Sequence, residues 1–321
     1  MDVSPLLSLL LFSLQVTGPI ALVVVLGVVF RRLDWINDAF VQGGSKLVFN
    51  VALPSLLFLN IVTARPTSIP GDGIILLALL FNLAWFLVLS VVTLFLVPHH
   101  DERGVFVQSS FRGNMGIIGL AFCLNAFGQE AALLASVYLA FNTLLYNVLS
   151  VITLSRWSPR ASHLHPVVAA SRDIVRNPLI IAILLAAVIV LLKIPVPVWV
   201  LDTGNYFARM TLPLALICVG ASLSWRGFVE AGRVTAWASA FKLIFIPVSA
   251  VLVAYWLGFG GLELGVFYLM AAAPTAAASY VMVRAMGGNA NLAASIIATS
   301  TVLSLVTTSV GLVALRAFGW V

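Results

Sequence analysis

The feature that most constrains this chain is its division into ten long apolar segments joined by short polar ones. Each segment is close to the roughly 20 residues that a helix needs to cross a bilayer. Charged residues make up only 9% of the chain, against about 25% in a typical soluble domain. The sequence therefore predicts an all-α polytopic membrane protein. The segments cover about residues 6–30, 38–62, 73–97, 104–126, 129–153, 177–194, 199–223, 234–258, 263–286 and 290–316.

The first five segments resemble the second five. Because five is an odd number, the second set must enter the membrane with opposite polarity, so the repeats are predicted to be inverted. We expect a first repeat over residues 1–154, a cytoplasmic linker over 155–176 and a second repeat over 177–321. Inverted repeats with matching helix breaks are typical of secondary transporters. The matching motifs are Gly18-Pro19-Ile20 with Asn177-Pro178-Leu179, Ala52-Leu53-Pro54 with Thr211-Leu212-Pro213, and Gly104-Val105-Phe106 with Gly265-Val266-Phe267.

Arginines are concentrated in alternate loops. With the N-terminus outside, the outer loops hold only Arg65 and Lys193, and Arg316 lies at the end of the last segment. This bias follows the positive-inside rule and predicts an inner or plasma membrane protein with both termini extracytoplasmic. The arginines expected on the cytoplasmic side are Arg31, Arg32, Arg103, Arg156, Arg160, Arg172, Arg176, Arg226 and Arg233.

Proline and glycine are expected to break four of the segments. Pro54 and Pro213 lie in the second and seventh, where each removes a backbone donor. The run 112–116 (RGNMG) interrupts the fourth segment, and the run 271–279, which contains Pro274, interrupts the ninth. Unwound backbone at membrane depth is tolerated only inside protein or along a wet cavity. We therefore expect segments four and nine to cross near the midplane and line the site.

The charged residues at depth are all basic. No Asp or Glu lies in the middle of a segment, which argues against a carboxylate proton relay. Arg112 precedes the break in segment four, and a cation beside half-helix N-termini favours an anionic substrate. The alternatives are that Arg112 caps helix carbonyls or snorkels to water. Lys46 and Lys242 are expected to snorkel, and Arg209 could bond carbonyls freed by the nearby proline.

Asparagines supply the uncharged polar groups at depth. Asn114 lies at the predicted break, where its amide can donate to a carboxylate and accept from a hydroxyl. Asn82, Asn142 and Asn147 are expected to hydrogen bond between helices. The motifs of ATP-binding loops, zinc proteases and serine hydrolases are missing from the sequence. We therefore expect no enzyme activity, no cofactor or metal, and no nucleic-acid partner.

Several motifs together resemble the auxin efflux carrier family, over nearly the whole chain. The compact form, without a long central loop, is similar to the bacterial members known as malonate or dicarboxylate permeases. The motifs are Phe49–Phe58 in the second segment, Asn177–Ile180 at the start of the sixth, Leu212–Leu223 in the seventh, Arg112–Gly116 and Pro274–Tyr280 at the two breaks, and Ser300–Ser304 in the tenth.

The resemblance implies ten helices in two inverted repeats, with broken crossing helices four and nine, as in the bile-acid-symporter and PIN-like fold. It also implies a scaffold of helices one, two, six and seven, often dimeric, and a moving unit made of the others. Pro54, Pro213 and Asn50 would be helix-break and scaffold residues. One departure is that PIN-type carriers have proline at both crossing points, whereas Gly113 occupies the first here.

Carried over by motif, Asn114 and the backbone around Gly113 and Pro274 would face the substrate. Our hypothesis adds contacts from Thr275, with Ser279 in the same segment, and positive potential from Arg112.

These features predict a secondary active transporter or uniporter that moves a small organic carboxylate anion, such as malonate or another dicarboxylate, by an elevator-like mechanism. The expected partners are that anion, the lipid bilayer and a second copy of the chain. A sodium-coupled symporter of the bile-acid type is one alternative, although it typically uses acidic side chains near the crossing. A passive channel and a non-transporting membrane sensor are the others.

Overall fold

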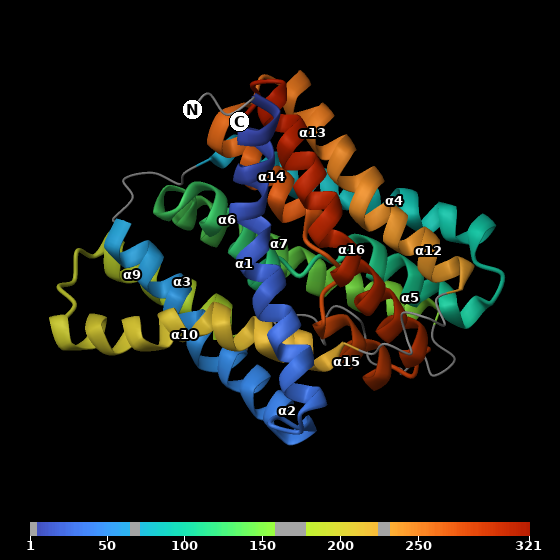
Figure 1. Ribbon diagram of the computed structural model, residues 1–321, viewed down its shortest axis with the longest axis horizontal. Helices are drawn as coiled ribbons and strands as arrows, with labels where there is room; N and C mark the ends of the chain where they lie inside the picture. The colour runs from blue at the N-terminus through green and yellow to red at the C-terminus, as the bar shows by residue number, and fades with distance from the viewer. Residues whose placement is uncertain (1–4, 65–70, 158–177, 224–231) are drawn as a thin grey trace.

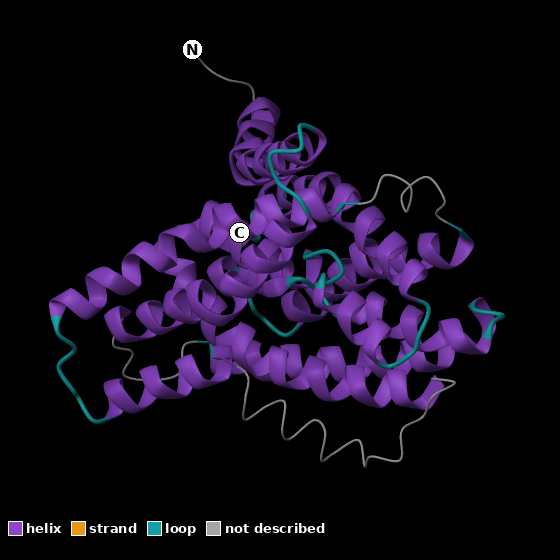
Figure 2. Cartoon of the chain, turned by 90° about the horizontal axis from the view of Figure 1, so that it is seen from below, coloured by secondary structure: helices purple, strands orange, loops and turns teal. Residues whose placement is uncertain are grey.

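The computed structural model describes residues 5–64, 71–157, 178–223 and 232–321, and within these ranges the secondary structure is helical, with one isolated β-bridge. Helices joined by short loops make up the part of the chain drawn in colour in Figure 2. The architecture is that of a polytopic membrane protein. Six described helical segments are long and apolar enough to cross a bilayer: Leu14–Arg32, Asp38–Thr63, Gly73–Leu96, Gln129–Trp157, Arg233–Trp256 and Ala290–Ala317.

Some helices are continuous and others are interrupted. The continuous ones are α1 (Pro5–Arg32), α4 (Asp72–Leu96), α7 (Gln129–Trp157), α9 (Pro178–Leu191), α10 (Val198–Ser222) and α16 (Ala290–Ala317). A π-helical turn divides two others, giving α2 (Asp38–Leu47), η1 (Val48–Ala52) and α3 (Leu53–Ala64), and α12 (Arg233–Ala240), η3 (Phe241–Phe245) and α13 (Ile246–Trp256). Non-helical backbone divides the remaining two, giving α5 (His100–Phe111), η2 (Met115–Gly119) and α6 (Leu120–Phe127), and α14 (Gly261–Ala272) and α15 (Ala278–Ala285).

The two mid-segment prolines have different effects. Pro54 is the second residue of α3, just after η1, and there the amide of Leu53 reaches back five residues to the carbonyl of Val48. Pro213 lies inside the uninterrupted helix α10, so the predicted break in segment seven is wrong. A proline removes one backbone donor, and a membrane helix continues past it when its remaining bonds hold. Arg209, one turn earlier, is exposed.

One group of helices is built on α1 and α10. These two cross in close contact, and α3 packs against both α9 and α10 (Figure 1). Glycines permit the close approach, since a Cβ added at Gly27 would overlap the carbonyl oxygen of Ile217, and one added at Gly220 would overlap that of Val24. Small residues at such crossings let backbones touch and add dispersion contacts. The two helices therefore come from opposite halves of the sequence and meet at this contact of Val24 and Gly27 with Ile217 and Gly220. We call it the α1–α10 seam.

The second group surrounds α5, α7 and α14. Helix α5 packs on α4 and α7, and α13 packs on α14. The interior of this second group contains large buried aromatic rings. The ring centroids of Phe111 and Tyr146 lie 5.5 Å apart, as do those of Phe81 and Phe267. The second of these contacts joins α4 to α14. The two halves of the sequence therefore share this core as well.

A buried amide network joins α4 to α7. The Nδ2 of Asn82 donates to the Oδ1 of Asn142 over 2.6 Å, and the hydroxyl of Tyr146 donates to the Oδ1 of Asn82 over 3.2 Å. The predicted interhelical role of Asn82 and Asn142 is confirmed. Such bonds satisfy polar groups that have no access to water at this depth.

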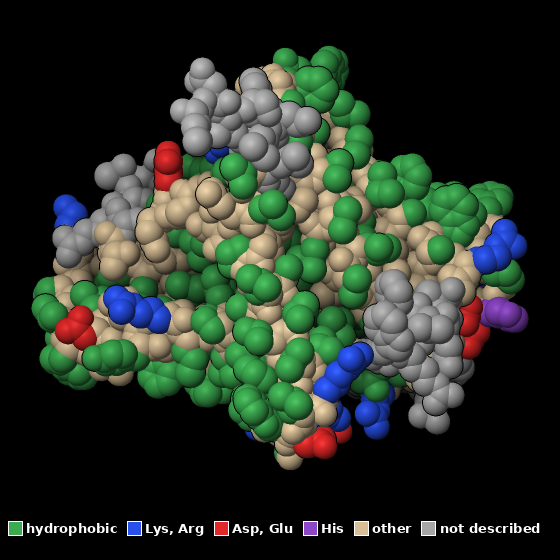
Figure 3. All heavy atoms as spheres, in the orientation of Figure 1, with side chains coloured by type: hydrophobic (Ala, Val, Ile, Leu, Met, Phe, Trp, Pro, Cys, Tyr) green, Lys and Arg blue, Asp and Glu red, His purple; other side chains and the backbone are tan. Residues whose placement is uncertain are grey.

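The beginning of α1 and the end of α16 lie at the same end of the molecule (Figure 1). The guanidinium of Arg316 lies 3.2 Å from the ring centroid of Phe12, which fixes the two helix ends against each other. Hydrophobic side chains cover much of the face seen in Figure 3, with charged side chains gathered toward its edges. This distribution suits a protein whose middle faces lipid.

Candidate functional site

The two helices with non-helical breaks meet at those breaks. The amide of Asn114 donates to the carbonyl of Pro274 over 2.6 Å, and the amide of Ala276 donates to the carbonyl of Arg112 over 3.0 Å. Gly113 and Thr275 form the isolated antiparallel bridge. The unwound segments therefore satisfy each other's hydrogen bonds, as buried backbone requires. We call this pairing of residues 112–114 with 273–277 the crossing.

Space is tight at Gly113, and a larger residue there would have to displace its neighbours by a few tenths of an ångström. A Cβ there would lie 3.1 Å from the Nζ of Lys242 and 3.3 Å from the carbonyl oxygen of Ala273. Gly119 is similarly confined, since its Cβ would lie 3.1 Å from the Sδ of Met270. Small residues thus let the two chains pass each other without separating the helices around them.

A cavity of about 400 Å³ lies beside the crossing. One wall is the backbone and side chains of Arg112–Ile117 together with Ala276–Ala278. The opposite wall includes Ser45, Lys46 and Asn50. The cavity therefore lies between the crossing and the α1–α10 group of helices.

A second cavity of about 1320 Å³ lies next to the first. Ser45, Ser222 and Ala277 line both cavities, and the second extends to Arg31 and Arg284. The second cavity therefore adjoins the first on the side of the molecule on which these arginines lie. The positive-inside rule predicts that this side is cytoplasmic.

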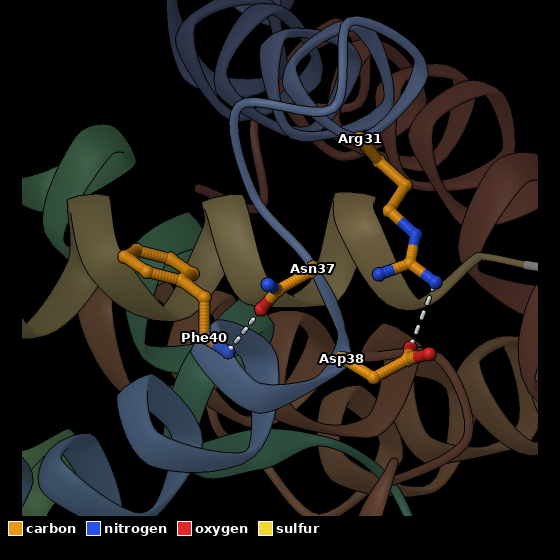
Figure 4. A network of polar contacts seen from close by, with 4 residues as sticks. All are labelled: Arg31, Asn37, Asp38 and Phe40. Carbon is orange, nitrogen blue, oxygen red and sulfur yellow. Dashed lines mark hydrogen bonds and ion pairs between the residues drawn. The ribbon is translucent and has the colours of Figure 1, made fainter.

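The α1–α2 turn, shown in Figure 4, contributes Arg31 and Asp38 to the lining of the second cavity. Arg31 at the end of α1 forms an ion pair of 2.9 Å with Asp38 at the start of α2. Asn37 caps α2, its side-chain oxygen accepting from the amide of Phe40 over 2.9 Å. This turn fixes where α2 begins, and α2 carries Ser45 and Lys46 to the cavity wall.

Arg112 is a buried cation with uncharged partners. Its Nη1 donates to the Oγ of Ser150 over 3.0 Å, and its Nη2 donates to the Oδ1 of Asn147 over 2.8 Å. Nη1 also lies 3.0 Å from the Sδ of Met282. The side chain is 9% exposed, and no carboxylate of the described residues pairs with it. It is therefore neither a snorkelling residue nor a carbonyl cap. Its bond to Asn147 joins the end of α5 to α7, so the predicted interhelical role of Asn147 is confirmed.

The predicted site residues divide between the cavity and the far side of the crossing. Arg112, Gly113, Asn114 and Asn50 line the cavity. Asn114 is 8% exposed, and its side chain has no hydrogen-bond partner among the described residues. The side-chain amide of Asn114 is thus available to a ligand.

Three other predicted residues do not line the cavity. Thr275 is fully buried, with its amide bonded to the Oγ of Ser300 and its hydroxyl donating to the carbonyl of Ser109. Ser279 is also fully buried, and Pro274 offers its carbonyl to the crossing. These contacts hold the shape of the crossing.

The expectation that Lys242 snorkels is wrong, whereas Lys46 is exposed. Lys46 lines the cavity beside Ser45 and Asn50, and Lys242 is fully buried, its Nζ donating to the carbonyl of Ala271 over 2.8 Å. The distance of a lysine from the end of its segment did not predict its burial, because the residues around each lysine come from other helices. Lys46 and Asn50 are four residues apart, which places them on one helix face. This spacing was the sequence signal that both could line one cavity.

Comparison with known proteins supports a transport role. A family model described as "Membrane transport protein" matches residues 16–312. An uncharacterized transporter of Methanothermobacter thermautotrophicus is 24% identical over 311 residues, which cover 92% of this chain and 95% of the relative. Uncharacterized transporter YfdV of Escherichia coli K12 is 23% identical, covering 87% and 91%. Uncharacterized transporter MJ1031 of Methanocaldococcus jannaschii is 24% identical, covering 86% and 88%.

Proposed function

The chain belongs to the membrane transport protein family, the auxin efflux carriers that its motifs resemble, and we propose that it is a permease for small organic carboxylate anions. The observation that supports this substrate class is that Arg112 lines the cavity and that the described partners of its buried guanidinium are all uncharged. A buried charge without a counter-charge is costly. A carboxylate in the cavity would supply the missing negative charge.

The backbone around the cavity also favours an anion. Helix η2 and its continuation α6 begin just after Asn114, and α15 begins at Ala278 on the same wall. Helix N-termini carry unpaired N–H groups and a positive partial charge. In our proposal Arg112 and Asn114 contact the carboxylate, while Pro274, Thr275 and Ser279 support the crossing. Lys46 and Asn50 approach the same ligand from the opposite wall.

For the transport cycle we propose ten membrane crossings in two inverted repeats, with the termini extracytoplasmic. The linker predicted over 155–176 lies, from residue 158 on, outside the described residues. The α1–α10 group would be the scaffold, through which two copies of the chain could dimerise. The crossing and its surrounding helices would move as an elevator against it. The cavity wall on α2 and α10 would then stay in place with the scaffold while the other wall moves.

Uptake into proteoliposomes tests the substrate class and the role of Asn114 together. We expect saturable uptake of a labelled dicarboxylate such as malonate at fixed membrane potential. Asn114→Ala should lower it about tenfold or more, because a hydrogen bond to a charged group contributes about 1.5–3 kcal/mol. Asn205→Ala, at an exposed position of α10, is the matched control and should transport normally.

Three results would contradict parts of this proposal. Undiminished uptake by Asn114→Ala would remove that residue from the site. A folded wild type that binds an acid without moving it would be a sensor, and conductance far above carrier turnover would indicate a channel.

The open side of the cavity can be tested by thiol labelling. Ser222 is exposed and lines both cavities, so Ser222→Cys in a background without Cys123 and Cys218 should react with a membrane-impermeant reagent. We expect labelling from the cytoplasmic side, slowed by saturating substrate. Ser304→Cys, at a fully buried position, should stay unmodified. Labelling of Ser222→Cys only from the outside would reverse the proposed orientation.

A further inference from the structure

Lys242 is a buried cation that the proposed anion site does not use. It lies on the π-helical turn η3, between α12 and α13, and its side chain has no exposed surface. Its Nζ donates to the carbonyl of Ala271 over 2.8 Å. Each acidic residue of the described chain lies in a loop or near a helix end, and none forms an ion pair with it. The fold therefore keeps an ammonium group at depth without a carboxylate.

The ammonium group lies at the crossing, on the side of the helix C-termini. Ala271 belongs to the last turn of α14, and Gly113 comes just after the end of α5. The Nζ lies 3.1 Å from the position that a Cβ at Gly113 would occupy. Because the bridge at Gly113 is antiparallel, α5 and α14 approach from opposite directions and end close together. Lys242 lies where these two ends meet.

Two helix C-termini meeting at this depth create a local excess of negative charge. The last carbonyls of a helix have no intrahelical partner, and the end carries a partial charge of roughly −0.5. In a medium of low dielectric constant such charges repel strongly. A positive charge between them offsets the repulsion, and the carbonyl of Ala271 accepts its hydrogen bond. A free monovalent cation could fill this role, and here a side chain does.

We propose that Lys242 is a tethered counter-cation for the crossing, which takes the place of a free inorganic cation between the carbonyl ends of α5 and α14. The carrier then needs no Na⁺ or K⁺ at this position, either to hold the crossing together or to move its anion. The transport part of this inference rests on the proposed function. The cation requirement is a property of the folded protein and can be measured without a substrate.

Thermal unfolding of the purified protein in detergent is the primary test. The wild type should melt at the same temperature in NaCl, KCl and choline chloride of equal ionic strength. Lys242→Met keeps the volume and removes the charge, so it should melt about 5 °C lower. Lys242→Arg keeps the charge and should lie between the two. Lys193→Met, at an exposed lysine, is the matched control and should melt like the wild type.

Chemical rescue separates charge from packing. Lys242→Ala leaves room for a small amine, so n-propylammonium should raise its melting temperature and should leave that of the wild type unchanged. Uptake should follow the same order, with Lys242→Met about tenfold or more below the wild type. A packing role predicts the opposite order, since an apolar side chain often replaces a buried ion without loss.

Several results would overturn the proposal. One is a Lys242→Met protein as stable and active as Lys242→Arg, and another is a wild type that melts higher in NaCl than in choline chloride. If none of the variants folds, the salt comparison on the wild type decides alone. If no acid is transported at all, the proposed function fails while the melting and rescue measurements still decide the role of Lys242.

Discussion

Replacing Arg112 by methionine should lower anion uptake about 100-fold, a loss of roughly 2.7 kcal/mol in transition-state or binding free energy, while the protein still folds. Arg112 is the charged residue of the crossing that lines the cavity, and the partners of its guanidinium, Ser150 and Asn147, are uncharged. Its charge is therefore available to the substrate. Methionine fills a similar volume, and replacing a buried charge by an apolar group is often neutral for stability. Activity and stability are thus expected to separate.

Arg112→Lys is the informative companion. It keeps the charge, but one ammonium group cannot reproduce the planar fork that reaches both Ser150 and Asn147. We expect uptake between that of the wild type and that of Arg112→Met. Arg209→Met, at an exposed arginine of α10, should transport normally. Normal uptake by a folded Arg112→Met protein would show that this charge does not recognise the substrate.

Gly27→Ala should destabilise the protein by about 1–3 kcal/mol, the usual range for overpacking a tight contact. The added methyl group would overlap the carbonyl oxygen of Ile217 and lie 3.0 Å from the amide nitrogen of Ala221. Backbone on the facing helix cannot move aside as a flexible side chain can, so α1 and α10 must separate. Because both helices belong to the proposed scaffold, the loss should appear as a lower melting temperature in detergent and a lower yield of folded protein.

The matched control for this prediction lies on the same helix. Gly18→Ala adds the same methyl group to α1 at a position where no atom lies within 4 Å. It should be neutral or slightly stabilising, because alanine favours the helix more than glycine does. Gly220→Ala, which meets the carbonyl of Val24 from the other side of the seam, should behave like Gly27→Ala. Equal melting temperatures for Gly18→Ala and Gly27→Ala would mean that the seam is not as tight as the structure has it.

The sequence alone determined those features that depend on neighbouring residues. Hydropathy over about 20 residues identifies membrane helices, because each helix satisfies its own backbone in lipid. Glycine at 113 and proline at 274 are local signals, and the structure has non-helical backbone at both places. The position of Arg112 beside a break favoured an anionic substrate, and the absence of acids at depth argued against a carboxylate proton relay.

Only the tertiary structure decided which groups meet. Lys46 and Lys242 gave similar sequence signals, yet one lines the cavity and the other lies behind the crossing. Thr275 sits at a break, yet contacts from Ser109 and Ser300 turn it away from the cavity. These outcomes depend on helices far apart in the chain, and the burial and partners of a side chain at depth are set by the neighbouring helices as well as by its own segment.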